Sequence, residues 1–136
     1  MKLIKNIGLL IALMITIIGS NYAQEKKLHS VKIEYEYFLT ESIDFVDCNS
    51  FKTAFNNTIR TKTFIDSLHL KRFRYLKRLF VKKKKALNVR GIITFDFGEI
   101  KVQYCFDRYG YFEKDGMTFY NKKLLAFLEK ELPLWG

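Results

Sequence analysis

The segment from residue 89 to residue 120 constrains the fold most, because it is the only long stretch in which apolar side chains recur at every second position. The alternation is carried by Val89, Gly91, Ile93, Phe95 and Phe97, and after Gly98 by Ile100, Val102, Tyr104 and Phe106. Successive side chains of a strand point to opposite faces, so this pattern predicts two strands of a hairpin. The pair Asp115-Gly116 is typical of a tight turn. We therefore expect a β-meander here.

Two strands are expected before the meander. Residues 31–39 alternate β-forming with charged residues, which predicts a strand whose outer face, with Glu34 and Glu36, contacts water. Residues 58–65 are rich in β-branched side chains and predict a second strand through Ile59, Thr61, Thr63 and Ile65. The intervening residues 41–49 carry few helix signals and are expected to form a loop.

Three helices are expected, each after a capping residue. Asn49 or Ser50 would cap a short helix, and Asp66 or Ser67 a longer one over about residues 68–81. The apolar side of the longer helix would be Leu68, Phe73, Leu76, Leu79 and Phe80. Asn121 would cap a last helix that carries Leu124, Leu125, Leu128 and Leu132 and ends before Pro133. We expect Trp135 to fold back onto the core.

This order of elements predicts an α+β fold with a mainly antiparallel sheet, a C-terminal β-meander and helices packed on one face. The chain contains thirteen Phe and eight Tyr, far more aromatic residues than disordered segments carry. Its length suits one hydrophobic core. We therefore expect residues 24–136 to form a single α+β domain.

The first residues match the pattern of a secretory signal peptide. Lys2 and Lys5 precede a short apolar run over residues 7–18, and Ala23 offers a small residue at the cleavage position. We expect residues 1–23 to be removed and the domain to be periplasmic or secreted, without a transmembrane span. An uncleaved anchor stays open, since Asn21 is not the small residue expected three positions before the cut. No cysteine follows the run, which argues against lipid attachment.

Positive charge is concentrated in one stretch. The chain has a formal net charge of +10, and residues 71–85 contain nine basic residues and no acid: Lys71, Arg72, Arg74, Lys77, Arg78, Lys82, Lys83, Lys84 and Lys85. We interpret this stretch as a basic helix that contacts an anionic envelope component or an acidic protein. The alternative is a solvated face that serves solubility. Nucleic acid is disfavoured by export and by the lack of interleaved aromatic residues other than Tyr75.

The expected function is therefore that of a non-enzymatic exported binding or accessory protein. One alternative is a proteinaceous inhibitor or immunity-like protein that binds a specific protein through a sheet edge or the meander loops. A small hydrolase is a third, for which no nucleophile with an adjacent base is evident. The oligomeric state is not predicted.

Cys48 and Cys105 are the only two cysteines in the chain. Export to an oxidising compartment favours a disulfide between them, which would stabilise the fold by about 4 kcal/mol through loop closure. A buried free thiol or a reactive thiol are the alternatives. Cys105 would face away from Val102, Tyr104 and Phe106, which suits a strand covered on both sides and does not distinguish these alternatives.

No metal or cofactor is expected. The acids Glu34, Glu36, Glu41, Asp44 and Asp47 gather near the N-terminal side but lack the spacing of a calcium loop. The two histidines and two cysteines are too scattered for a zinc site. The segment Asp107-Arg108-Tyr109-Gly110 could bind a polar ligand, or Asp107 could instead bond nearby backbone N–H groups in a turn that Gly110 supplies.

The segments NVRGIITFDF, QYCFDRYGYFEKDG and YNKKLLAFLEKEL resemble small exported proteins of Gram-negative bacteria that have no assigned function. The resemblance is best in the C-terminal third. It implies a stand-alone exported α+β domain with a structural cysteine pair, and it brings no catalytic residue to this sequence.

Overall fold

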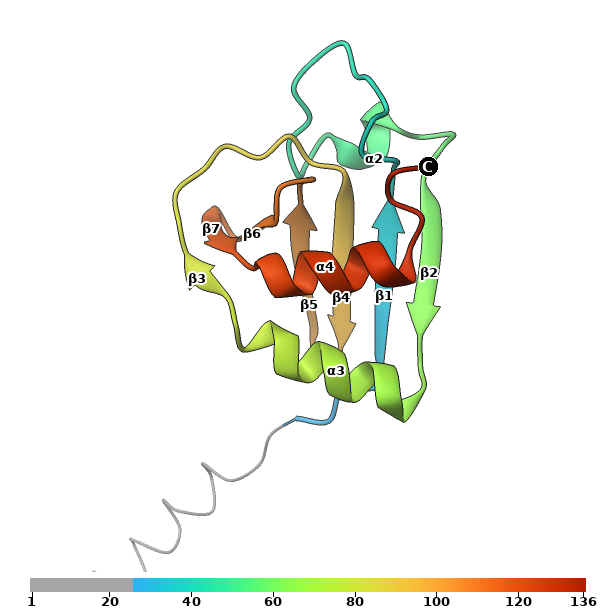
Figure 1. Ribbon diagram of the computed structural model, residues 1–136, viewed down its shortest axis with the longest axis vertical. Helices are drawn as coiled ribbons and strands as arrows, with labels where there is room; N and C mark the ends of the chain where they lie inside the picture. The colour runs from blue at the N-terminus through green and yellow to red at the C-terminus, as the bar shows by residue number, and fades with distance from the viewer. Residues whose placement is uncertain (1–25) are drawn as a thin grey trace, which may run out of the picture.

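The computed structural model describes residues 26–136, which form one seven-stranded antiparallel sheet and three helices (Figure 1). The strands are β1 Ser30–Tyr35, β2 Arg60–Phe64, β3 Val81–Lys82, β4 Gly91–Asp96, β5 Lys101–Phe106, β6 Tyr111–Lys114 and β7 Met117–Tyr120. The helices are α2 Phe51–Ala54, α3 Ser67–Lys77 and α4 Lys122–Glu131. This architecture confirms the α+β prediction and the C-terminal meander. The expected signal peptide, residues 1–23, lies outside the described residues.

The spatial order of the strands is β2-β1-β4-β5-β6-β7-β3, so the meander strand β4 lies beside β1 at the centre. Ile93 of β4 is opposite Ile33 of β1 and Tyr104 of β5. The tight turn between β6 and β7 forms at Asp115 and Gly116, which both have positive φ values, 51° and 76°. The alternation of the sequence therefore sets which side chains enter the core.

The two longer helices, α3 and α4, lie across the same face of the sheet (Figure 1). Phe73 and Leu76 of α3 and Leu124 and Leu128 of α4 are buried in one core with the apolar side chains of β1, β4 and β5. Both helices begin as predicted, because Asp66 accepts a hydrogen bond from the His69 N–H and Asn121 accepts one from the Leu124 N–H. The Asn121 amide also donates to the Leu76 carbonyl, which joins the start of α4 to α3.

A smaller cluster covers part of the opposite face of the sheet. Its buried residues are Val46, Phe51, Phe55, Leu87, Val89, Ile92 and Cys105. Phe51 comes from the short helix α2, whose N-cap is Ser50, and Ile92 and Cys105 are opposite one another in β4 and β5. A disulfide joins Cys48 to Cys105, as predicted, and anchors this loop region to the sheet.

The helix expected over residues 68–81 ends four residues earlier, at Lys77. The ring of Phe80 stacks on Tyr104 with the centroids 4.6 Å apart and also contacts Phe112. These contacts draw the chain to the edge of the sheet, where Val81 and Lys82 pair with β7. The prediction that Leu68 belongs to the apolar side was wrong, since this side chain is exposed.

The first strand ends at Tyr35 instead of residue 39, and the expectation that Glu36 faces water was wrong. Glu36 is buried, and its carboxylate accepts hydrogen bonds from the Tyr37 N–H and from the hydroxyl groups of Thr40 and Thr58. These donors are supplied by the turn after β1 and by the segment before β2. Trp135 does return to the domain, where it packs edge-on against Phe38, but it remains about half exposed.

Candidate anion-binding surface

The structure separates the nine predicted binding residues into three groups. Arg74, Lys77 and Arg78 lie toward the hairpin that joins β4 to β5, whereas Lys71 and Arg72 line a groove between α3 and α4. The other four, Lys82, Lys83, Lys84 and Lys85, belong to β3 and to the loop that follows it. The helix predicted to about residue 81 ends at Lys77, and the chain then changes direction, so the basic residues do not share one surface.

The first group forms part of a concavity of about 440 Å³, which we call the basic cleft. Its four basic residues are Lys26, Arg74, Lys77 and Arg78, and its apolar residues are Leu28, Phe97, Ile100 and Val102. Lys26 was missed in the sequence analysis because it is distant in sequence from α3. The backbone hydrogen bond from the His29 N–H to the Asp96 carbonyl places this part of the chain beside the β4–β5 hairpin. The cleft therefore combines positive charge with an apolar floor.

Lys77 is partly enclosed by aromatic rings in the basic cleft. Its Nζ lies 4.7 Å from the centre of the Phe97 ring and 5.5 Å from that of Phe95. Burial, with a smaller contribution from the positive charge of Lys114, holds the pKa of Lys77 below its ordinary value. A charge on a partly desolvated apolar surface interacts more strongly with a nearby anion than a fully hydrated charge does.

The groove between α3 and α4 has a larger volume, about 1100 Å³, and contains four basic residues besides His69. Lys71 and Arg72 line it from α3, and Lys123 and Lys130 line it from α4. Glu131 brings a negative charge into the same groove and lies 3.1 Å from Nε2 of His69. The groove is therefore mixed in charge, whereas the residues of 26–136 that line the basic cleft include no acid.

His69 connects the two helices within this groove. Its Nδ1 lies 2.7 Å from Oδ2 of Asp66, while Nε2 meets Glu131 on α4. The hydrogen bond to Asp66 is the main cause, and that to Glu131 the second, of a pKa of His69 above its ordinary value. The hydrogen bond from the His69 backbone N–H, and secondarily the contact with the His69 ring, holds the pKa of Asp66 below its ordinary value.

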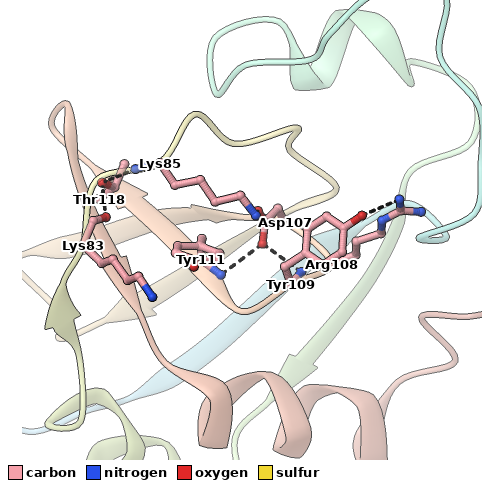
Figure 2. Close-up of polar contacts among 7 residues, drawn as sticks. All are labelled: Lys83, Lys85, Asp107, Arg108, Tyr109, Tyr111 and Thr118. Atoms are coloured by element: carbon pink, nitrogen blue, oxygen red, sulfur yellow. Dashed lines mark hydrogen bonds and ion pairs between the residues drawn. The ribbon is translucent and has the colours of Figure 1, made fainter.

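Two lysines of the third group have contacts within the domain. Figure 2 shows Lys85 extended toward Asp107, and the distance from its Nζ to Oδ2 is 3.3 Å. The same ammonium lies 4.2 Å from the centre of the Tyr109 ring and 4.1 Å from that of Tyr111. Lys83 lies over Tyr120 at 5.3 Å, and its carbonyl accepts a hydrogen bond from the Thr118 hydroxyl. These contacts attach the loop to the meander, although Lys83 is exposed, as are Lys82 and Lys84.

The Asp107-Arg108-Tyr109-Gly110 segment forms a turn, as one of the two interpretations predicted. Oδ1 of Asp107 accepts hydrogen bonds from the Tyr109 and Tyr111 N–H groups at 2.9 and 3.0 Å (Figure 2). Gly110 has a φ of 94°, which a side chain would strain. Asp107 is thus a buried structural residue that fixes the positions of Arg108 and Tyr109.

The reactive-thiol and metal sites considered from the sequence are not formed in residues 26–136. The two cysteines are joined in the disulfide, so neither is a free thiol. Within this part of the chain, no group of three or more His, Cys, Asp and Glu side chains is placed to hold a metal ion. Of the acids considered for calcium, Glu34 lies near Lys32 and Lys52, whereas Glu36 is buried among hydroxyl donors. None of the helices in residues 26–136 has the length and apolar character needed to cross a membrane.

Comparisons with known proteins found no matching family model, no matching curated protein and no matching solved structure.

Proposed function

We propose that this chain is an exported, non-enzymatic accessory domain that binds an anionic amphiphile of the cell envelope through the basic cleft. The observation that carries the proposal is the convergence of Lys26, Arg74, Lys77 and Arg78 around an apolar floor. An anionic head group would contact the cations, and part of an acyl chain would cover the apolar residues. Phospholipids and lipopolysaccharide both combine these two chemistries.

The apolar floor favours an amphiphile over an acidic protein or a soluble polyanion. Ile100 is exposed, and Phe97 and Val102 are only partly buried in the absence of a ligand. Covering apolar surface contributes roughly 25 cal/mol per Å², while each basic residue near an anionic membrane contributes about 1 kcal/mol. The two contributions together give a weak but selective attachment to anionic lipid.

Binding to vesicles of defined composition tests this function. The protein, purified after export into an oxidising periplasm, would be mixed with vesicles of phosphatidylglycerol or of phosphatidylcholine and separated by flotation. We expect it to float with phosphatidylglycerol at low salt and to be released as salt rises, because surface charges are then screened. Equal flotation with both lipids, or none with either, would contradict the proposal.

A parallel experiment, in which the protein captures binding partners from an envelope extract, distinguishes lipid binding from the binding of one specific protein. A single protein that remains bound through a high-salt wash, together with no flotation, would favour the inhibitor or immunity-like interpretation instead.

A further inference from the structure

A third concavity, of about 600 Å³, lies at the other end of β4 from the basic cleft. Arg90 directly precedes β4 and lines this pocket, whereas Phe97 directly follows β4 and lines the cleft. Asn88 lines it beside Arg90, the loop after β1 contributes residues that include Glu41, and the turn between β5 and β6 supplies Arg108 and Tyr109. The two sites therefore share no residue.

Arg90 is a buried cation whose partners are all uncharged. Its Nη1 donates to Oδ1 of Asn88 at 3.0 Å and to the Val89 carbonyl at 2.9 Å. Its Nη2 donates to the Thr40 carbonyl at 3.2 Å and to Oγ of Ser42 at 3.3 Å. No carboxylate of residues 26–136 forms an ion pair with it, although Glu36 acts on it from a greater distance. A buried guanidinium without a contacting anion is costly, because hydrogen bonds alone do not neutralise the charge.

Arg108 brings a second positive charge to the same pocket. Burial is the main cause of a pKa of Arg90 below its ordinary value, and the charge of Arg108 is the next cause. The Arg108 guanidinium is held beside Tyr109, to whose hydroxyl it donates a hydrogen bond at 2.6 Å (Figure 2). The Asp107 turn fixes both residues at the pocket, so the like charges cannot easily separate.

The rim of this pocket is open to water and combines three large apolar side chains with the exposed carboxylate of Glu41. Arg90 and Arg108 outnumber this single acid, so the charge of the lining remains positive. Leu39 and Phe45 are each about 60% exposed, and Tyr109 is about half exposed. Exposed aromatic and aliphatic side chains around convergent cations are suited to a ligand with one anionic end and one apolar end.

We propose that this pocket binds a small organic carboxylate that bears an apolar substituent. The hydrogens on both Nη atoms of Arg90 are already donated to protein acceptors, so Arg90 attracts the ligand through its charge without a direct hydrogen bond from these atoms. The planar guanidinium of Arg108 contacts the two carboxylate oxygens. The apolar substituent lies against Leu39, Phe45 and Tyr109. Inorganic phosphate would leave that rim uncovered and is expected to bind more weakly.

Titration with hexanoate, followed by chemical-shift changes in the full exported protein, tests the proposal. Hexanoate should shift the signals of the Ser42, Arg90 and Arg108 backbone amides in a saturable manner. Hexanol lacks the charge, and acetate and inorganic phosphate lack the apolar chain, so all three should bind at least about tenfold more weakly. Hexanol or phosphate binding as tightly as hexanoate would overturn the proposal, as would the absence of saturable shifts with hexanoate.

The variant Arg108→Gln removes the guanidinium group that contacts the carboxylate and leaves the buried Arg90 in place. It should weaken hexanoate binding by about ten- to a hundredfold, the range expected for a lost charged hydrogen bond. Lys84→Gln, which removes an equal charge from an exposed position, should leave the affinity unchanged. Equal weakening in both variants would show general charge attraction and would overturn the assignment to this pocket.

Discussion

Asp107 illustrates how a single buried residue can perform two structural functions. One carboxylate oxygen accepts two backbone hydrogen bonds, and the other accepts none within residues 26–136 but lies 3.3 Å from Nζ of Lys85. Asp107→Asn keeps an oxygen for the turn but removes the negative charge. We expect the free energy of unfolding to fall by about 1–3 kcal/mol, because the Lys85 ammonium loses its anionic partner while remaining only one-third exposed.

Urea denaturation measures this change, and Asp115→Asn provides the control. Asp115 makes the same type of contact, with Lys114, but its side chain is 83% exposed. Its substitution should alter stability little, since exposed ion pairs contribute about 1 kcal/mol or less. Equal losses of unfolding free energy in the two variants would show that burial does not increase the contribution of the Asp107–Lys85 ion pair to stability.

His69 should make stability depend on pH near neutrality. Asp66 and Glu131 raise its pKa in the folded state, so the folded protein holds this proton more tightly than the unfolded chain. The resulting stabilisation is complete below the unfolded pKa of about 6.5 and is lost as pH rises through the higher folded value. Urea denaturation at a series of pH values should show this loss, and His69→Gln should remove it. An unchanged pH dependence in the variant would contradict the assignment.

At the scale of elements, the pairing of β4 with β5 depends on Gly91. Gly91 is opposite Phe106, whose ring covers the position that a side chain would take. A Cβ at residue 91 would lie 2.1 Å from the nearest ring carbon, so the ring and the strand would have to move apart. We expect Gly91→Ala to destabilise the fold by about 1–3 kcal/mol, the usual cost of overpacking a core.

A double-variant cycle measured by urea denaturation tests this cause. Phe106→Leu removes the ring and should destabilise the protein by itself, but Gly91→Ala should then cost much less than it does in the presence of Phe106. Additive effects of the two substitutions would show that the ring does not occupy the space above Gly91.

Local sequence signals predicted the elements whose limits depend on local chemistry. Asp66 and Asn121 cap the two longer helices, and the alternation after Val89 produced the meander strands. The end of α3 was not predictable in this way, because it depends on contacts of Phe80 with Tyr104 and Phe112, which are distant in sequence. The burial of Glu36 has a similar origin, since Thr58 is one of its donors.

For the whole molecule, the basic stretch was evident in the sequence but its division was not. After Lys77 the chain changes direction, and Lys82 pairs with β7 at the edge of the sheet, away from the β4–β5 hairpin. Lys26, near the start of the domain, lies in the basic cleft instead. Arg90 was also not predicted as a site residue, because no local motif in the sequence distinguishes it within the meander. Only the fold places it beside Arg108.

Anionic lipid should bind at the basic cleft and not to positive charge in general. Two double variants change the net charge equally: Lys26→Glu with Arg74→Glu in the cleft, and Lys82→Glu with Lys84→Glu outside it. Flotation with phosphatidylglycerol vesicles at low salt compares them directly. The cleft variant should bind at least about tenfold more weakly than the unmodified protein, since each basic residue at the membrane surface contributes about 1 kcal/mol, and the outer variant should retain most binding. Equal loss in both variants, or loss only in the outer variant, would contradict the account.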